Sequence, residues 1–146
     1  MKRHRLRKTR FGLDVAKLAA RRLRDEITAP LCETLCRRFN ELKLGRPWHS
    51  ESNPALKREG ELLVRCFSVS AGLEIIVSIS ATVAGLEIVV NVDRLNQAGR
   101  LSHVHHTSSL AEIEAGGEWM YQQIRAAGES VIRTLATPPD QQGTGK

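Results

Sequence analysis

The fold is decided by the stretch from Glu61 to His106, in which one short sequence occurs twice. The run Ala71-Gly-Leu-Glu-Ile-Ile-Val77 returns thirteen residues later as Ala84-Gly-Leu-Glu-Ile-Val-Val90. After each glycine, apolar and polar residues alternate, and a period of two is typical of a strand with one buried face. The glycines allow the positive φ that tight hairpin turns require. The repeat therefore predicts two neighbouring antiparallel strands.

The alternation extends on both sides of the repeat. We expect strands near residues 61–70, 73–82, 86–93 and 100–107, connected by short turns. Apolar residues of the two central strands fall on one face, and polar residues fall on the other. The sequence thus predicts a four-stranded antiparallel meander whose polar face is lined by Glu74, Ser78, Ser80, Glu87 and Asn91.

Helical periodicity flanks the predicted sheet. From about residue 11 to residue 44, apolar residues recur at steps of three and four: Ala16, Ala20, Leu23, Ile27, Leu31, Leu35, Phe39 and Leu42. Pro30 is expected to kink or restart this helix, because it removes a hydrogen bond to the carbonyl of Glu26, and Thr28 could cap the second segment. A further long helix is predicted from Ser109, which opens a capping-box pattern, to about Ala136.

This order of elements predicts a two-layer α+β domain with both helices on the apolar face of the sheet. Within the 146 residues we expect a basic flexible arm at 1–10, a single domain at 11–136 and a flexible tail at 137–146. Proline, serine and asparagine mark residues 46–60 as a loop. No apolar run approaches the ~20 residues of a spanning helix, and no export signal is apparent, so we expect a cytoplasmic protein without a membrane partner.

The three cysteines, Cys32, Cys36 and Cys66, are an odd number and poor material for a disulfide framework. Free cysteine behaves as a small apolar residue, so we expect buried core positions in a reducing compartment. Cys32 and Cys36 lie one helical turn apart and could instead supply two metal ligands.

Charge is distributed unevenly along the chain. Residues 1–10 contain six lysines or arginines and no acid, which equals the formal net charge of +6 for the whole chain. Residues 1–60 hold 16 basic residues against seven acidic ones, and residues 61–146 hold six against nine. This asymmetry indicates an anionic partner that meets the N-terminal side.

The predicted function is therefore non-enzymatic binding of nucleic acid, or of a complex containing it, through the basic arm and the first helix. Trp48 is included because an aromatic ring beside Arg46 and His49 could stack on a base, although packing over the sheet edge is the alternative. A solubility tail and an anionic membrane surface are the alternatives for the arm. The candidate residues are Lys2, Arg3, Arg5, Arg7, Lys8, Arg10, Lys17, Arg21, Arg24 and Trp48.

Catalytic and cofactor motifs are missing from the sequence: it has no phosphate-binding glycine loop, nucleophile elbow or known zinc spacing. His103 and His105 alternate along a predicted strand with His106 beside them, and a His-x-His pair can chelate a metal. An exposed polar strand is the simpler interpretation, and we predict no metal or cofactor. The alternative function is a protein-interaction module, such as an assembly factor, chaperone or inhibitor, that uses the polar sheet face or a sheet edge, as a monomer or a homodimer.

Overall fold

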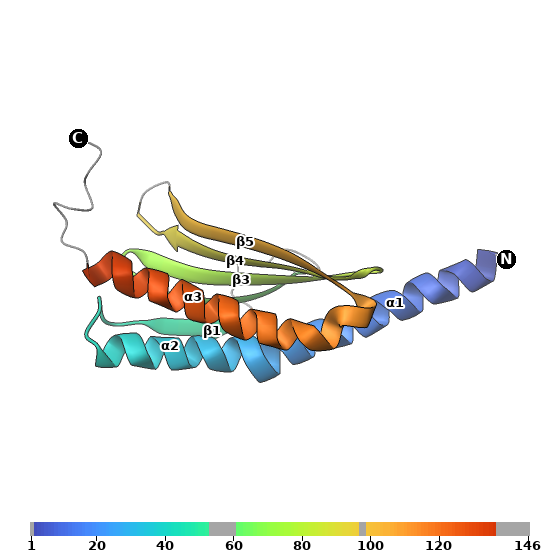
Figure 1. The fold of residues 1–146 in the computed structure, drawn as a ribbon, viewed down its shortest axis with the longest axis horizontal. Helices are drawn as coiled ribbons and strands as arrows, with labels where there is room; N and C mark the ends of the chain where they lie inside the picture. Colours follow the sequence, from blue (N-terminus) through green and yellow to red (C-terminus); the bar gives the residue numbers. More distant parts are fainter. Residues whose placement is uncertain (1, 53–60, 97–98, 137–146) are drawn as a thin grey trace.

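The computed structural model describes residues 2–52, 61–96 and 99–136, with the backbone alone for 2–10 and 114–116. It shows one antiparallel sheet with a long helical segment at each end of the chain (Figure 1). The elements are α1 (Lys2–Leu23), the π-helical turn η1 (Arg24–Thr28), α2 (Ala29–Glu41), β1 (His49–Ser52), β2 (Glu61–Ser68), β3 (Leu73–Thr82), β4 (Gly85–Arg94), β5 (Arg100–Ser109), the 3₁₀ turn η2 (Leu110–Ala115) and α3 (Gly116–Ala136).

The α+β class and the antiparallel sheet are confirmed, but the predicted strand count was wrong. The sheet has five strands in the order β1-β2-β3-β4-β5. The additional strand, β1, lies in the predicted loop 46–60 and pairs with β2 from His49↔Phe67 to Ser52↔Val64. It has the sequence His-Ser-Glu-Ser and carries no apolar alternation. Pairing with β2 at the sheet edge makes this segment a strand, and a single-sequence pattern does not report that contact.

The repeated sequence forms the centre of the sheet, as predicted. β3 and β4 pair so that Val77 lies opposite Val90 and Ile75 lies opposite Val92. These side chains are almost fully buried and belong to a single core between the sheet and the helices. Gly85 follows the turn with φ +147°, and a Cβ there would overlap the carbonyl oxygen of Ser108. Glycine is therefore required where β4 begins beside the end of β5.

All three long helices cover one face of the sheet. α1 packs on β3 and β4, α2 on β1 and β2, and α3 on β4 and β5 (Figure 1). α1, η1 and α2 follow one another along the layer, and the N-terminal part of α1 projects past the ends of the strands. The helix begins at Lys2, so the backbone of the predicted arm continues α1. A separate flexible arm at 1–10 stays a prediction, and the predicted tail 137–146 lies outside the described residues.

The π-helical turn η1 changes which residues of α2 face the core. Before the turn the buried positions follow the predicted stripe, with Ala16, Ala20 and Leu23. After it the most buried positions are Thr28, Cys32, Cys36 and Phe39, whereas Leu42 is 50% exposed. A π turn adds one residue to a helical turn, so the stripe passes from Leu23 to Thr28 rather than to Ile27. The most buried positions thus shift by one residue beyond Leu23, except at Phe39. The predicted Ile27, Leu31 and Leu35 are half-buried and still pack against the core, whereas Leu42 does not belong to it.

The break in the helix is the turn before Pro30, and Pro30 itself lies in the first turn of α2. The N–H of Ala29 donates to the carbonyl of Arg24, five residues earlier. Thr28 occupies the predicted N-cap position of α2, but its side chain makes no capping hydrogen bond. Its hydroxyl donates instead to the carbonyl of Leu23 at 3.1 Å. A proline has no N–H to donate, and the π turn places this gap where the helix restarts.

Candidate nucleic-acid interface

α1 meets the rest of the protein along a narrow face. Ala16 and Ala20 are buried against the sheet, and Gly12 lies where the helix crosses the turn between β3 and β4. A Cβ on Gly12 would lie 2.8 Å from the carbonyl oxygen of Val83. Small residues thus allow α1 to approach the sheet closely up to Gly12. Residues before it lie on the projecting part of the helix (Figure 1).

Two of the three predicted basic residues in the body of α1 and η1 face solvent. Lys17 and Arg21 are exposed and lie four residues apart, on one side of α1. The side chain of Arg24 is 16% exposed and its Nε lies 2.7 Å from Oδ1 of Asp25. This hydrogen bond lowers the pKa of Asp25. Arg24 is therefore engaged within the chain.

The six basic residues of the predicted arm lie on the same helix. Lys2, Arg3, Arg5, Arg7, Lys8 and Arg10 fall within α1, and their side chains lie outside the described part of the structure. α1 contains nine lysines or arginines and one acid, Asp14, and so carries +8 of formal charge. The remainder of the chain consequently carries −2.

Trp48 is a packing residue rather than a surface one. Its side chain is 3% exposed and its ring centroid lies 4.7 Å from that of Phe39. The indole N–H donates to the carbonyl of Leu44, and Asn40 bonds both the N–H and the carbonyl of Trp48, at 2.8 and 3.2 Å. This is the packing alternative, and it removes Trp48 from the candidate interface. The sequence around Trp48 does not predict this burial, because its neighbours Arg46 and His49 are polar and exposed.

α1 also carries an apolar row that the helical periodicity did not single out. Phe11 is 70% exposed, Leu18 is 52% exposed and Val15 is 37% exposed. Their spacing of four and three places them on one face, and Val15 and Leu18 line a groove of about 390 Å³ together with Leu110 and Ile113. An exposed apolar patch of this kind is typical of an interaction site.

The second face of the sheet, away from the helices, is less polar than predicted. Ile76 and Val89 are half-buried on it, beside the predicted Ser78 and Asn91. An ion pair joins β2 to β3 on this face: Nη2 of Arg65 lies 2.7 Å from Oε2 of Glu74. The Arg65 guanidinium also lies 3.7 Å from the ring centroid of Phe67.

Burial raises the pKa of Glu74, and the neighbouring Asp93 acts in the same direction, while Arg65 opposes both. Glu74 and Asp93 are direct cross-strand partners. Two like charges opposite each other destabilise a sheet unless cations lie beside them, and here each carboxylate has an arginine partner, Arg65 and Arg100.

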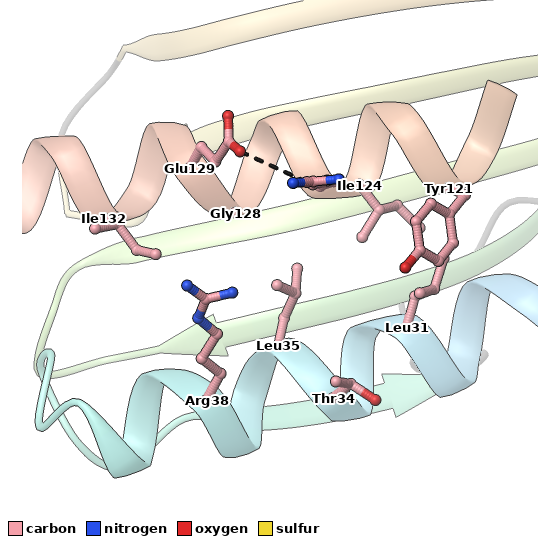
Figure 2. A pocket seen from close by; sticks show the side chains of 10 residues that line it. Leu31, Thr34, Leu35, Arg38, Tyr121, Ile124, Gly128, Glu129 and Ile132 are labelled. Atoms are coloured by element: carbon pink, nitrogen blue, oxygen red, sulfur yellow. Dashed lines mark ion pairs between the residues drawn. The ribbon is translucent and has the colours of Figure 1, made fainter. Parts of the chain in front are cut away.

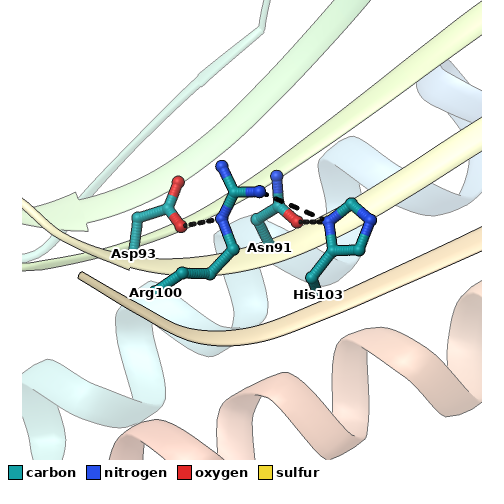
Figure 3. Close-up of polar contacts among 4 residues, drawn as sticks. All are labelled: Asn91, Asp93, Arg100 and His103. Atoms are coloured by element: carbon teal, nitrogen blue, oxygen red, sulfur yellow. Dashed lines mark hydrogen bonds and ion pairs between the residues drawn. The ribbon is translucent and has the colours of Figure 1, made fainter. Parts of the chain in front are cut away.

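The histidines of β5 do not form a metal centre. Nδ1 of His103 lies 2.6 Å from the side-chain oxygen of Asn91. Arg100 lies between His103 and Asp93 and contacts both (Figure 3). His105 is exposed on the same face. Among the described residues no group of three histidine, cysteine or carboxylate side chains is placed to hold a metal.

His106 and Leu101 lie on the helix-facing side of β5. His106 stacks on Trp119 of α3, with ring centroids 4.5 Å apart, and its Nε2 lies 3.0 Å from the Ser108 hydroxyl. Leu101 packs on the core, and a β-bulge opposite Val92 and Asp93 places it there. A strict period of two would place Leu101 on the face of His103, and the bulge places it on the helix-facing side instead.

All three cysteines are free and buried in the core, as predicted. Burial raises the pKa of Cys32 to about 12. The thiol of Cys66 shares a hydrogen bond with Cys36, and this bond together with burial also raises the pKa of Cys66. Thiols of this kind are weak nucleophiles and weak metal ligands.

A groove of about 450 Å³ separates α2 from α3 (Figure 2). Leu31, Leu35 and Ile132 form its apolar wall, and Arg38 and Glu129 lie along its rim. Leu31 and Leu35 line this groove because the π turn rotates them away from the sheet. The groove contains no set of convergent polar groups that would fix a ligand, so we do not include it in the interface.

No helix in the described ranges has the length and apolarity needed to cross a membrane. Comparison of the chain with protein-family models, with curated proteins and with solved structures gave no match.

Proposed function

We propose that the protein binds nucleic acid through α1, with the phosphate backbone as the main target. The observation that carries this proposal is the +8 charge of one helix whose N-terminal part projects from a body of charge −2. A helix can lie along or in a groove of a duplex, where lysine and arginine side chains displace condensed counterions.

The geometry favours binding through charge over base stacking. Lys17 and Arg21 extend the basic surface from the projecting segment onto the body, and both are exposed. Burial of Trp48 removes the aromatic ring that had suggested stacking on single-stranded bases. A duplex, with two phosphate strands around each groove, is therefore the preferred target over a single strand.

Salt dependence tests this proposal directly. If the six basic residues of 2–10 together with Lys17 and Arg21 contact phosphates, the slope of log K against log salt is about −7 on duplex DNA. Fluorescence anisotropy with a short labelled duplex, a single strand of the same sequence and an RNA duplex gives this slope from about 50 to 200 mM salt. The double variant Lys17→Ala/Arg21→Ala is expected to reduce the slope by about 2.

The matched control is Arg37→Ala/Arg38→Ala, which removes two exposed cations from α2 and should leave the slope unchanged. Removal of residues 1–10 should make the slope less negative by about 5, because six basic residues are lost. If the full chain shows no salt-dependent binding to any of the three probes, or if both α1 changes leave the slope intact, the proposal is wrong.

A second candidate function, binding of another protein, is favoured by the apolar row of Phe11, Val15 and Leu18. Leu18→Ser is then expected to abolish the capture of a protein partner and, because it adds no charge, to leave the affinity for the duplex nearly unchanged. Leu42→Ser is its control, because Leu42, the residue after α2, is about equally exposed. Equal partner capture by both variants would exclude the apolar row as the binding surface.

A further inference from the structure

β5 forms one edge of the sheet and has no partner on its outer side among the described residues. It is ten residues long, Arg100–Ser109, whereas β1 at the opposite edge has four. On the outer side of an edge strand, backbone N–H and C=O groups lack the partners that they have within a sheet. A long edge of this kind is a template for pairing with a further strand.

The usual protection of an edge strand is missing from most of β5. Lysine, arginine, aspartate, glutamate and proline do not occur between Leu101 and Ser109. The charge at the start of the strand, Arg100, is held by Asp93 with Nε and Oδ1 2.8 Å apart. The β-bulge opposite Val92 and Asp93 disturbs the same end and leaves the pairing from Ser102 onward regular.

The side chains along this edge are compatible with a second copy of the same strand. His103, His105 and Thr107 are exposed on the open face of the sheet, and all three are uncharged when histidine is neutral. An antiparallel pair of identical strands is related by a two-fold axis, so each polar side chain meets a polar side chain of the same set. No like charges oppose each other between Ser102 and Ser109.

We propose that two copies of this chain pair edge to edge, antiparallel, through Ser102–Ser109 of β5, and so form one continuous sheet. α1 is a poor alternative interface between copies, because two helices of +8 repel each other. β1 is also poor, since it is short and carries Glu51. The β5 pairing is independent of nucleic acid and leaves both α1 helices free.

The test is sedimentation of the full chain across a range of concentrations at pH 8. His105→Lys introduces a charge at the middle of the edge, so that two lysines meet near the two-fold axis. We expect a dimer for the unchanged chain and a dissociation constant at least about 10-fold higher for His105→Lys. His49→Lys makes the same change on the opposite edge strand and should sediment as the unchanged chain does.

Hydrogen exchange supplies a readout that depends on strand pairing itself. The backbone amides of Ser102–Ser109 that face away from β4 should exchange more slowly at high protein concentration, and those of β1 should not change. Far-UV circular dichroism establishes that both lysine variants are folded. A monomer at all concentrations, a dimer insensitive to His105→Lys, or a dimer whose β5 amides gain no protection would each overturn the proposal.

Discussion

The register change at η1 makes a prediction about the reactivity of the native cysteines. In a regular helix the apolar stripe of α1 would continue through Leu31 and Leu35, and Cys32 would be rotated about 100° from it. In the structure Cys32 is fully buried and burial raises its pKa to about 12 from an ordinary 9.0. Alkylation of this thiol under native conditions therefore reports whether the π turn is present.

The magnitude follows from the fraction of thiolate, which is the reactive form. At pH 8 a thiol of pKa about 12 is ionised to about one part in 10⁴, and a thiol of pKa 9.0 is ionised to about one part in 10. Ionisation alone slows Cys32 by about 10³-fold. Exclusion of the reagent from the core slows it further. Cys36 and Cys66 share the same core and should be protected with it.

The assay is alkylation with iodoacetamide at pH 8, followed by mass spectrometry of the peptides. Leu42→Cys supplies a reference thiol near the end of the same helix, because Leu42 is 50% exposed. The reference thiol should be modified at least about 10³ times faster than Cys32, and all thiols should react alike in concentrated guanidinium. Modification of Cys32 within about tenfold of the reference in the folded protein would refute both the register and the burial of α2.

Three further predictions concern stability. Phe39→Ala should lower the free energy of unfolding by about 3–5 kcal/mol and Leu42→Ala by about 1 kcal/mol or less, measured by urea denaturation; equal losses would contradict the packing. Gly85→Ala should cost about 2–4 kcal/mol and lower the melting temperature, because its Cβ would overlap a carbonyl of the adjacent strand; an unchanged melting temperature would show that the turn is built differently. Arg65→Ala removes the cation beside Glu74, a carboxyl whose pKa is already raised by burial. The loss of unfolding free energy in this variant should therefore grow as the pH rises above 4.5 and the carboxylate ionises. Urea titrations at acidic and neutral pH measure this, and a loss independent of pH would exclude the electrostatic cause.

The elements that could be predicted from the sequence are those in which buried and exposed residues follow a regular period. β3 and β4 are recognisable because every second side chain enters the core, and α1 is recognisable as far as Leu23 for the equivalent helical reason. β1 was missed because backbone pairing with β2 creates it, and its side chains are polar. The π turn and the bulge at Leu101 were missed for a common reason. Each adds one residue to a regular repeat, so a fixed period continued across it misplaces residues at or beyond it, such as Cys32 beyond the π turn and Leu101 at the bulge.

The candidate interface divides in the same way. Lys17 and Arg21 are exposed because they lie opposite the buried alanines of α1, a relation that the helical period contains. The fates of Arg24 and Trp48 depend on contacts with specific neighbours, Asp25 for the arginine and Phe39 for the tryptophan. The sequence left both the stacking and the packing interpretation of Trp48 open and placed Arg24 on the basic side of the helix, and the local partners decide between these possibilities.

The charge on α1 also works against the helix that carries it. Basic residues within the first turns of a helix oppose the positive end of its dipole, and basic residues three and four positions apart on one helix repel each other. The backbone before Gly12 also lies on the part of α1 that projects past the ends of the strands (Figure 1). Phosphate groups would relieve both electrostatic penalties at once, because they neutralise the cations and favour the helix N-terminus. If α1 binds nucleic acid as proposed, bound phosphates should stabilise the projecting part of the helix, and this coupling would give the basic segment a physical reason to be continuous with it.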